Sequence, residues 1–341
     1  MQQLTMTADR RVEWWDVPAP ALQGPGEALV RPLAVALCDL DQPILRGDAP
    51  IPGPIAIGHE FVAEVTEVGD EVRAVAPGDR VVVPFQISCG ACARCRRGQT
   101  GDCTTVAPRS MYGFGAFGGD WGGALSDLVR VPFADAMLVA APAGIAPAVL
   151  ASASDNIPDG WRTVAPHLAQ RPGADVLVVG GGGRSIALYA VDAARALGAG
   201  RVLYADADAG RLAVAEELGA EVVDGPPQGS YGDFSITVDA SGAHAGLHAA
   251  LRSTEPGGVC TSIGIYYEPL TPVPLLEMYT TGVTLVTGRA MARATMPAVL
   301  EQIAAGDLRP DRVTSNVVPW EQAAEAVAEA QTKLVIERRP V

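Results

Sequence analysis

Short apolar runs separated by proline and glycine characterise the first part of the chain. From Arg11 to about Val83, the segments EALVRPLAVAL, FVAEVTEVG and DRVVVPF each hold several aliphatic residues between turn-forming positions. Runs of this length, rich in valine and bounded by turn residues, are typical of β-strands. The pattern predicts a small β-rich domain.

The spacing of apolar residues changes after Gly173. The segment ADVLVVGGGG is typical of a buried strand that runs into a turn, and apolar residues then recur at helical spacing from Ile186 to Leu197. A second helix is predicted from Asp208, its N-cap, to Leu218. Further strands are expected at RVLYAD, AEVVD, FSITVDAS, GGVCTSIGI and VTLVTG. Alternating strands and helices predict an α/β domain with a doubly wound parallel sheet.

A cluster of four cysteines stands in the segment CGACARCRRGQTGDC. Its members are Cys89, Cys92, Cys95 and Cys103. Thiolates at these short separations can surround one tetrahedral zinc ion and leave no ligand position for chemistry. An iron-sulfur cluster is the alternative, although the spacing differs from that of the usual ferredoxins. Disulfides are not expected, because nothing marks the chain as secreted. We therefore predict a structural zinc site.

The composition limits the size and the partners of the protein. With 341 residues the chain exceeds one ordinary core, so two domains are expected. A formal net charge of -14 repels nucleic acid and anionic membranes. The N-terminal segment lacks the apolar core of a signal peptide, and the chain has no uninterrupted apolar stretch of about 18 residues. We expect a cytoplasmic protein that binds neither nucleic acid nor membranes.

The glycines after the strand at ADVLVVGGGG suggest a dinucleotide site. Gly180 and Gly182 occupy two positions of the GxGxxG pattern, and Ser185 replaces the third glycine. Asp206 ends the next strand about 20 residues further on, where a carboxylate can hold both ribose hydroxyls and repel a 2′-phosphate. Because Asp208 rather than a basic residue follows, NAD(H) is favoured over NADP(H). The alternative is a glycine-rich turn that binds no dinucleotide.

Cys38 and His59 are candidate ligands of a second metal. Cys38 lies in ALCDLD and His59 in IAIGHEF. One Cys and one His from neighbouring loops, with a third ligand and a water molecule, would form a catalytic zinc site. Taken alone, each residue is more often an ordinary packed side chain.

Four segments together resemble the zinc-dependent medium-chain alcohol dehydrogenases over nearly the whole chain. They are VPAPALQGPGEALVRPLAVALCDLD, GHEFVAEVTEVGDEVRAVAPGDRV, the four-cysteine lobe and VLVVGGGGRSIALYAVDAARALGA. The resemblance implies a GroES-like catalytic domain at residues 1–155 and 289–341, around a Rossmann NAD-binding domain at residues 156–288. It also implies a homodimer or homotetramer with two zinc ions per chain.

The same resemblance implies the roles of residues around the second metal. Cys38 and His59 are zinc ligands, Glu60 is a neighbouring carboxylate that can approach the metal, and Asp41 holds His59 in its ligating tautomer. Many relatives use a third ligand Cys that this chain lacks. The segment SASDNIPDGW looks like the aspartate variant of the formaldehyde-dehydrogenase-like branch, which makes Asp155 a ligand. The alternative is that Asp155 caps a helix.

Further roles follow from the resemblance for residues near the cofactor and the substrate. Ile263 and Gly264 are expected near the nicotinamide, and Arg211 is expected to face the adenosine ribose, unless it is a solvated helix residue. Trp121 is a candidate wall of the substrate pocket, with core packing as the alternative.

The chain departs from the family pattern at the proton relay. Leu40 and Pro43 stand where relatives have a Ser or Thr and often a His, and neither side chain can carry a proton. Asp159 replaces a Thr that commonly packs beside the nicotinamide. We favour an alcohol or polyol dehydrogenase in which Glu60, Asp159 or a water chain moves the proton. The alternatives are a reductase of a conjugated alkene or imine, and a non-catalytic protein that senses NAD(H).

Overall fold

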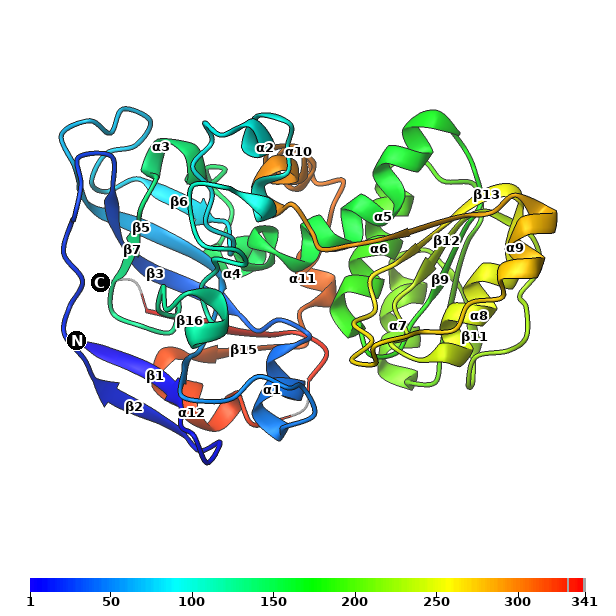
Figure 1. Ribbon diagram of the computed structural model, residues 1–341, viewed down its shortest axis with the longest axis horizontal. Helices are drawn as coiled ribbons and strands as arrows, with labels where there is room; N and C mark the ends of the chain where they lie inside the picture. Colours follow the sequence, from blue (N-terminus) through cyan, green and yellow to red (C-terminus); the bar gives the residue numbers. More distant parts are fainter. Residues whose placement is uncertain (330, 340–341) are drawn as a thin grey trace. The chain divides into compact units, whose positions relative to one another are not determined.

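The computed structural model describes residues 1–329 and 331–339, which form two compact units (Figure 1). Unit 1 contains the described parts of Met1–Pro158, Ala290–Ala304 and Thr314–Val341, and unit 2 contains Asp159–Arg289 and Ala305–Val313. Within the described ranges, no helix is long and apolar enough to cross a bilayer.

Unit 1 is the β-rich part of the chain, as the sequence predicts. Its strands are β1 (Gln2–Met6), β2 (Val12–Asp16), β3 (Ala28–Ala36), β4 (Ile55–Ala56), β5 (Glu60–Val68), β6 (Arg80–Val83), β7 (Val129–Val131), β8 (Val139–Ala140), β15 (Asn316–Pro319) and β16 (Leu334–Glu337). The larger sheet has the order β15-β16-β3-β5-β6-β8, with β7 also paired to β3, and the smaller sheet has the order β2-β1-β4. Strand β16 comes from the C-terminal part and lies beside β3 from the N-terminal part.

The helices of unit 1 are short. They are α1 (Asp41–Arg46), α2 (Ala93–Arg96), α3 (Ala134–Met137), α4 (Pro147–Leu150), α12 (Ala323–Ala326), most of α10 (Ala292–Ala305), and the 3-10 helices η1 (Thr100–Asp102), η2 (Gly115–Gly118), η3 (Ala151–Ser154) and η4 (Trp320–Gln322). Helices α1, α2, η1 and η3 stand within a few residues of candidate ligands.

Strand β3 is central in the larger sheet although it contains Pro32. The pairing register with β5 shifts between Pro32 and Ala34. Proline lacks the N–H that a ladder requires, so it is tolerated in a sheet where a bulge interrupts the pairing. Beyond the bulge, β3 pairs regularly as far as Ala36, close to the candidate ligand Cys38.

Unit 2 contains a six-stranded parallel sheet with the order β11-β10-β9-β12-β13-β14. The strands are β9 (Val176–Val179), β10 (Val202–Asp206), β11 (Glu221–Asp224), β12 (Phe234–Asp239), β13 (Thr254–Ser262) and β14 (Thr284–Thr287). The helices are most of α5 (Asn156–Gln170), α6 (Arg184–Ala196), α7 (Ala209–Glu217), α8 (His244–Arg252), α9 (Leu275–Thr281) and α11 (Pro310–Val313). The order reverses direction at β9, which is typical of the doubly wound fold. The predicted fold class is confirmed.

The local signals that predict the first two helices of this sheet agree with the structure. Helix α6 follows the glycines, and its apolar residues are buried against the sheet. Helix α7 is capped by Asp208, whose side chain accepts a hydrogen bond from the Arg211 N–H at 2.9 Å. An aspartate at this position satisfies an N–H that has no partner within the helix.

The segment Ala305–Val313 belongs to unit 2, although it lies in the range 289–341 that the sequence assigned to the other domain. The Arg309 N–H donates to Asp192 on α6 at 2.7 Å, and α11 contacts α6. This backbone bond to a buried carboxylate is long-range, and no local pattern in the sequence reveals it.

Candidate functional site

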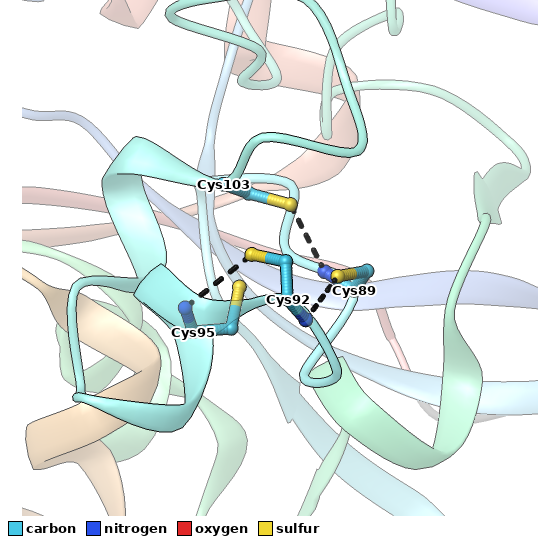
Figure 2. Close-up of side chains that lie close together, drawn as sticks. All are labelled: Cys89, Cys92, Cys95 and Cys103. Carbon is cyan, nitrogen blue, oxygen red and sulfur yellow. Dashed lines mark hydrogen bonds between the residues drawn. The ribbon is translucent and has the colours of Figure 1, made fainter.

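The four cysteines of the lobe converge on one point (Figure 2). Backbone N–H groups donate to three of the sulfurs: Cys92 N to Cys89 Sγ at 3.3 Å, Cys95 N to Cys92 Sγ at 3.4 Å, and Cys89 N to Cys103 Sγ at 3.5 Å. The pKa of the Cys92 thiol falls to about 5, chiefly because the Cys95 N–H stabilises the thiolate. All six cysteines of the chain are free. Thiolates held by N–H donors suit a closed zinc site.

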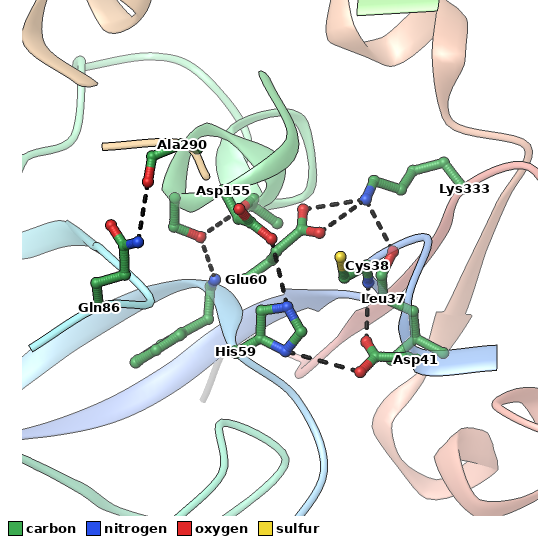
Figure 3. Close-up of polar contacts among 12 residues, drawn as sticks. Leu37, Cys38, Asp41, His59, Glu60, Gln86, Asp155, Ala290 and Lys333 are labelled. Carbon is green, nitrogen blue, oxygen red and sulfur yellow. Dashed lines mark hydrogen bonds and ion pairs between the residues drawn. The ribbon is translucent and has the colours of Figure 1, made fainter. Parts of the chain in front are cut away.

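The second cluster is built where β3, β5 and η3 meet within unit 1. Cys38 follows β3, His59 and Glu60 stand at the start of β5, and Asp155 follows η3. The hydroxyl of Ser154 accepts the Phe61 N–H at 2.8 Å and thereby fixes η3 beside β5. Ligand atoms of the four residues all lie within 4.8 Å of one another (Figure 3).

The imidazole of His59 is fully buried between two carboxylates. Its Nδ1 is 3.7 Å from Asp41 Oδ1, and its Nε2 is 3.4 Å from Asp155 Oδ2. Within the described residues, neither ring nitrogen has a hydrogen-bond partner. A buried polar atom without a partner is costly, so this arrangement favours a ligand-binding position at the imidazole.

The Cys38 loop and helix α1 hold Asp41 beside His59. The Cys38 N–H donates to Asp41 Oδ2 at 2.8 Å, and this bond leaves the other carboxylate oxygen directed toward the imidazole. A carboxylate in this position selects the His tautomer that protonates Nδ1 and leaves Nε2 available.

The negative charges around Cys38 and His59 favour the binding of a cation. Burial, followed by the charges of Asp155, Glu60 and Asp41, raises the pKa of the Cys38 thiol well above its usual value. Burial alone lowers the pKa of His59, but the same carboxylates outweigh it and raise the pKa to about 9. A divalent cation reverses both effects, because it stabilises a thiolate and a neutral imidazole.

The residues present fit a zinc ion. Two ligands at the usual zinc distances lie about 3.3 Å apart on a tetrahedral ion. The separation of 3.4 Å between His59 Nε2 and Asp155 Oδ2 is close to this value. Sulfur, imidazole nitrogen and carboxylate oxygen are all ligands that zinc accepts.

Lys333 is a member of this site that the sequence reasoning missed. Its Nζ donates to Leu37 O at 2.8 Å and to Glu60 Oε1 and Oε2 at 3.0 Å each (Figure 3). Both side chains of the ion pair are fully buried. Lys333 precedes β16, which returns to β3 from the far end of the chain. One signal was available in the sequence, because Lys333 is the only lysine among 25 lysine and arginine residues.

Aromatic rings flank His59. The ring centroids of Phe114 and Phe85 are 4.9 Å and 5.7 Å from the centroid of the imidazole. Trp121 instead packs against the core of unit 1, and Arg130 lies 5.4 Å from its ring centroid. The packing of Trp121 therefore favours the core alternative, and Phe85 and Phe114 are the apolar groups beside the candidate metal.

The candidate dinucleotide residues lie along one edge of the sheet in unit 2. A Cβ on Gly180 would stand 2.4 Å from Asp206 Oδ2, so only glycine fits between the end of β9 and the end of β10. The Gly182 N–H donates to Ser241 O at 2.9 Å, and Ser185 is buried in the first turn of α6. The same edge also carries two residues after β13. They are Ile263, whose side chain lies against Gly183, and Gly264, which lies against Gly242.

Asp206 and Arg211 line a cavity of about 230 Å³ at this edge. Arg211 binds the carboxylate with two bonds, Nε to Oδ2 and Nη2 to Oδ1, each 2.7 Å long. The Tyr204 hydroxyl and the Asp208 N–H also donate to it, at 2.5 Å and 3.0 Å. Burial raises the pKa of Asp206, but Arg211 and Tyr204 outweigh it and leave the pKa below its usual value. Asp206 is therefore charged where it lines the cavity, and its carboxylate already accepts four hydrogen bonds.

The three residues that depart from the family pattern, Leu40, Pro43 and Asp159, lie in different units. Leu40 precedes α1 and Pro43 lies in its first turn, so neither supplies a polar side chain near Cys38. In unit 2, Asp159 accepts a hydrogen bond from Arg162 Nε at 2.5 Å.

Comparisons with known proteins agree with both units. Residues 24–143 match the alcohol dehydrogenase GroES-like domain, and residues 185–305 match the zinc-binding dehydrogenase domain. A probable zinc-binding alcohol dehydrogenase of Mycobacterium tuberculosis is 32% identical over 327 residues, which cover 93% of this chain and 82% of that protein. A glutathione-independent formaldehyde dehydrogenase of Pseudomonas aeruginosa is 34% identical over 227 residues, or 63% of this chain and 56% of that protein.

A solved structure is also similar to this chain over its whole length. Alcohol dehydrogenase TADH from Thermus sp. ATN1 superposes with a TM-score of 0.90 at 32% identity, over 99% of this chain and 100% of that chain. The similarity extends over both units.

Proposed function

Because the chain belongs to the zinc-binding alcohol dehydrogenase family of medium-chain dehydrogenases, we propose that it interconverts an alcohol or polyol with a ketone or aldehyde, using NAD(H) and a catalytic zinc ion. The family assignment makes it an oxidoreductase that acts on CH–OH groups.

One observation carries the proposal: ligand atoms of Cys38, His59, Glu60 and Asp155 converge within 4.8 Å in unit 1. The four-cysteine lobe forms a separate cluster, which we assign to structural zinc. A closed site and an open site together account for two zinc ions per chain. The aspartate ligand resembles the variant expected for the formaldehyde-dehydrogenase-like branch.

The chemistry that zinc and nicotinamide supply when bound is polarisation of the substrate oxygen and transfer of a hydride. The residues of the chain prepare this chemistry. Asp41 keeps Nε2 of His59 available, Cys38 and Asp155 supply two negative ligands, and Phe85 and Phe114 pack beside the imidazole. Leu40 and Pro43 cannot move a proton, so we assign the proton route to water.

The acid at the end of β10 supports NAD(H) as the cofactor. Asp206 is charged and lines the cavity in unit 2, where a 2′-phosphate would meet its negative charge. Arg211 has to release part of its bond to Asp206 when ribose hydroxyls bind, since the carboxylate already has four donors.

Metal content and activity test the proposal together. We expect two zinc ions per chain and NAD⁺-dependent oxidation of members of an alcohol and polyol panel. Cys38→Ala should retain one zinc ion and lose this activity. One zinc ion in the wild-type protein, unaffected by this substitution, would refute the catalytic site.

The missing relay favours one alternative, the reduction of a conjugated alkene or a cyclic imine. Consumption of NADH with a ketone, an enone and a cyclic imine distinguishes the two reactions. Activity restricted to the enone or the imine would replace the alcohol dehydrogenase proposal.

We also propose that the protein is a cytoplasmic homodimer or homotetramer. Strand β14 is an edge strand, and large apolar side chains are exposed in the segment before it, including Leu270 at 85%, Tyr279 at 83% and Leu276 at 77%. An exposed edge next to an apolar surface favours pairing with a second copy. None of the six cysteines forms a disulfide, which suits a reducing compartment.

A further inference from the structure

The chain passes from unit 2 back into unit 1 at a segment that contacts the four-cysteine lobe. Unit 2 includes Arg289, and unit 1 resumes at Ala290. We call residues 290–293 the re-entry segment. Ala290 and Ala292 are buried, and helix α10 begins at Ala292. The position of the re-entry segment therefore fixes where α10 starts.

Gln86 holds the re-entry segment with both ends of its side-chain amide. Its Nε2 donates to Ala290 O at 2.9 Å (Figure 3), and its Oε1 accepts the Ala292 N–H at 3.4 Å. An amide carries both a donor and an acceptor, so one side chain binds two backbone groups. Gln86 is almost fully buried and stands three residues before Cys89, the first cysteine of the lobe.

The lobe itself contacts the re-entry segment through Gly101. The Gly101 N–H donates to Met291 Sδ at 3.2 Å. A Cβ on Gly101 would stand 2.3 Å from Gln86 Nε2, and the bonds of Gln86 to the segment prevent its amide from moving aside. Glycine therefore allows the lobe to pack directly on the amide that holds the segment.

A second contact between the lobe and the segment passes through α3. A Cβ on Gly90 would stand 2.8 Å from the Cβ of Ala136, so the start of the lobe lies against this helix. Ala136 O accepts a hydrogen bond from Arg293 Nε at 2.7 Å. The lobe and the re-entry segment therefore share Ala136 as a neighbour.

The lobe has few buried residues to hold its shape. From Cys89 to Cys103, the regular structure consists of α2 with four residues and η1 with three. The buried positions in this range are Cys95, Thr100, Gly101 and Cys103. An ion that joins four thiolates supplies the folding free energy that a core supplies in larger elements.

We propose that the lobe is a zinc-dependent clamp on the re-entry segment, given the structural zinc ion assigned above. With the ion bound, Gly101 and Gln86 hold residues 290–293 in place and fix the start of α10. Without the ion, the lobe loses the shape that places Gly101, and the re-entry segment opens locally. The lobe thereby couples zinc binding to the point at which the chain passes from one unit to the other.

Amide hydrogen exchange on the full-length protein, followed by mass spectrometry, provides the first test. In Cys92→Ser, which removes the lobe ion, the peptide that covers residues 290–296 should exchange about 10-fold faster, because buried hydrogen bonds are lost. Cys38→Ala, which removes the ion of the other cluster, is the matched control and should leave this peptide at the wild-type rate. An unchanged rate in Cys92→Ser, or an equal acceleration in the two variants, would overturn the proposal. The result for Cys92→Ser is independent of the second ion, whose absence from the wild-type protein would refute the proposed function alone.

Coupling between two sites is reciprocal, so the re-entry segment must in turn affect zinc binding by the lobe. The Cys38→Ala background carries only the lobe ion, and equilibrium competition with a chelator measures its affinity. Adding Gln86→Leu keeps all four cysteines and removes both bonds to the segment, and the affinity for zinc should fall by about 10-fold.

Gln42→Leu in the same background is the matched control, because Gln42 is also buried and donates to a carbonyl, that of Glu329. This control should leave the affinity of the lobe for zinc unchanged. Equal affinities with and without Gln86→Leu, or an equal loss in the control, would contradict the proposal. Because no lobe cysteine is replaced here, this test stands even if Cys92→Ser folds poorly.

Discussion

The preference for NAD(H) should depend on the charge of Asp206. Its carboxylate lines the cavity of unit 2 and is almost fully buried, and Arg211 binds it with two bonds of 2.7 Å. The substitution Asp206→Asn keeps the size of the side chain and removes its charge. We expect weaker binding of NADH, because the ribose hydroxyls lose a charged acceptor. NADPH should bind more tightly, because a 2′-phosphate no longer meets the carboxylate and Arg211 becomes available to it.

The size of this effect follows from two contributions. Two unit charges 4 Å apart interact by about 4 kcal/mol at the effective dielectric constant of a protein surface, and counterions reduce this value. A hydrogen bond to a charged group contributes about 1.5–3 kcal/mol. Since Arg211 already neutralises part of the charge, we expect a change of about 3 kcal/mol in the difference between the two cofactors. The ratio of their dissociation constants should therefore change by about 100-fold.

Fluorescence titration with NADH and NADPH at fixed ionic strength measures this ratio without turnover. Asp208→Asn is a matched control, because it also removes one negative charge near Arg211 and asparagine preserves the helix cap. The control should change the ratio by less than about 3-fold, since Asp208 is half exposed and its charge is screened by solvent. Equal changes in the two variants would mean that overall charge, and not Asp206, determines the preference.

Three further predictions concern metal content, pH and assembly. Cys92→Ser should lower the zinc content from two ions to one, measured by elemental analysis, and reduce the Tm by about 5–10 °C, measured by calorimetry. An unchanged zinc content would exclude a four-thiolate site. Burial raises the pKa of Asp192 to about 6 from its usual 3.8, so the wild-type protein should lose up to about 3 kcal/mol of stability as pH rises from 4 to 7. Asp192→Asn should not show this loss in denaturant titrations at the two pH values, and parallel curves for the two proteins would contradict the assignment. Leu276→Glu should shift the protein to a smaller species in analytical ultracentrifugation without changing its zinc content, and an unchanged species would exclude this surface as the interface.

Local sequence patterns were sufficient for the fold class and for several elements that form the candidate dinucleotide edge. Strand β9, the glycines after it and the Asp208 cap of α7 depend on residues close together in the chain, so their spacing alone predicts them. The four-cysteine lobe is local for the same reason, because its ligands lie within one short segment. The segment Ala305–Val313 was assigned to the other domain, because its attachment to Asp192 depends on contacts far apart in sequence.

The sequence by itself predicted the four-cysteine cluster, since residue type and spacing limit which metal it can bind. The ligands of the second cluster were predicted from the resemblance to the family, because Cys38 and His59 lie far from Asp155 in the chain. Only the tertiary structure placed Lys333 on Glu60, gave Asp206 its four hydrogen-bond donors and packed Trp121 against the core of unit 1. Lys333 and Glu60 are 273 residues apart in the sequence and meet because β16 pairs with β3. The physical reason is that local spacing fixes which groups are present, whereas burial and long-range strand pairing fix which partner each charged group receives.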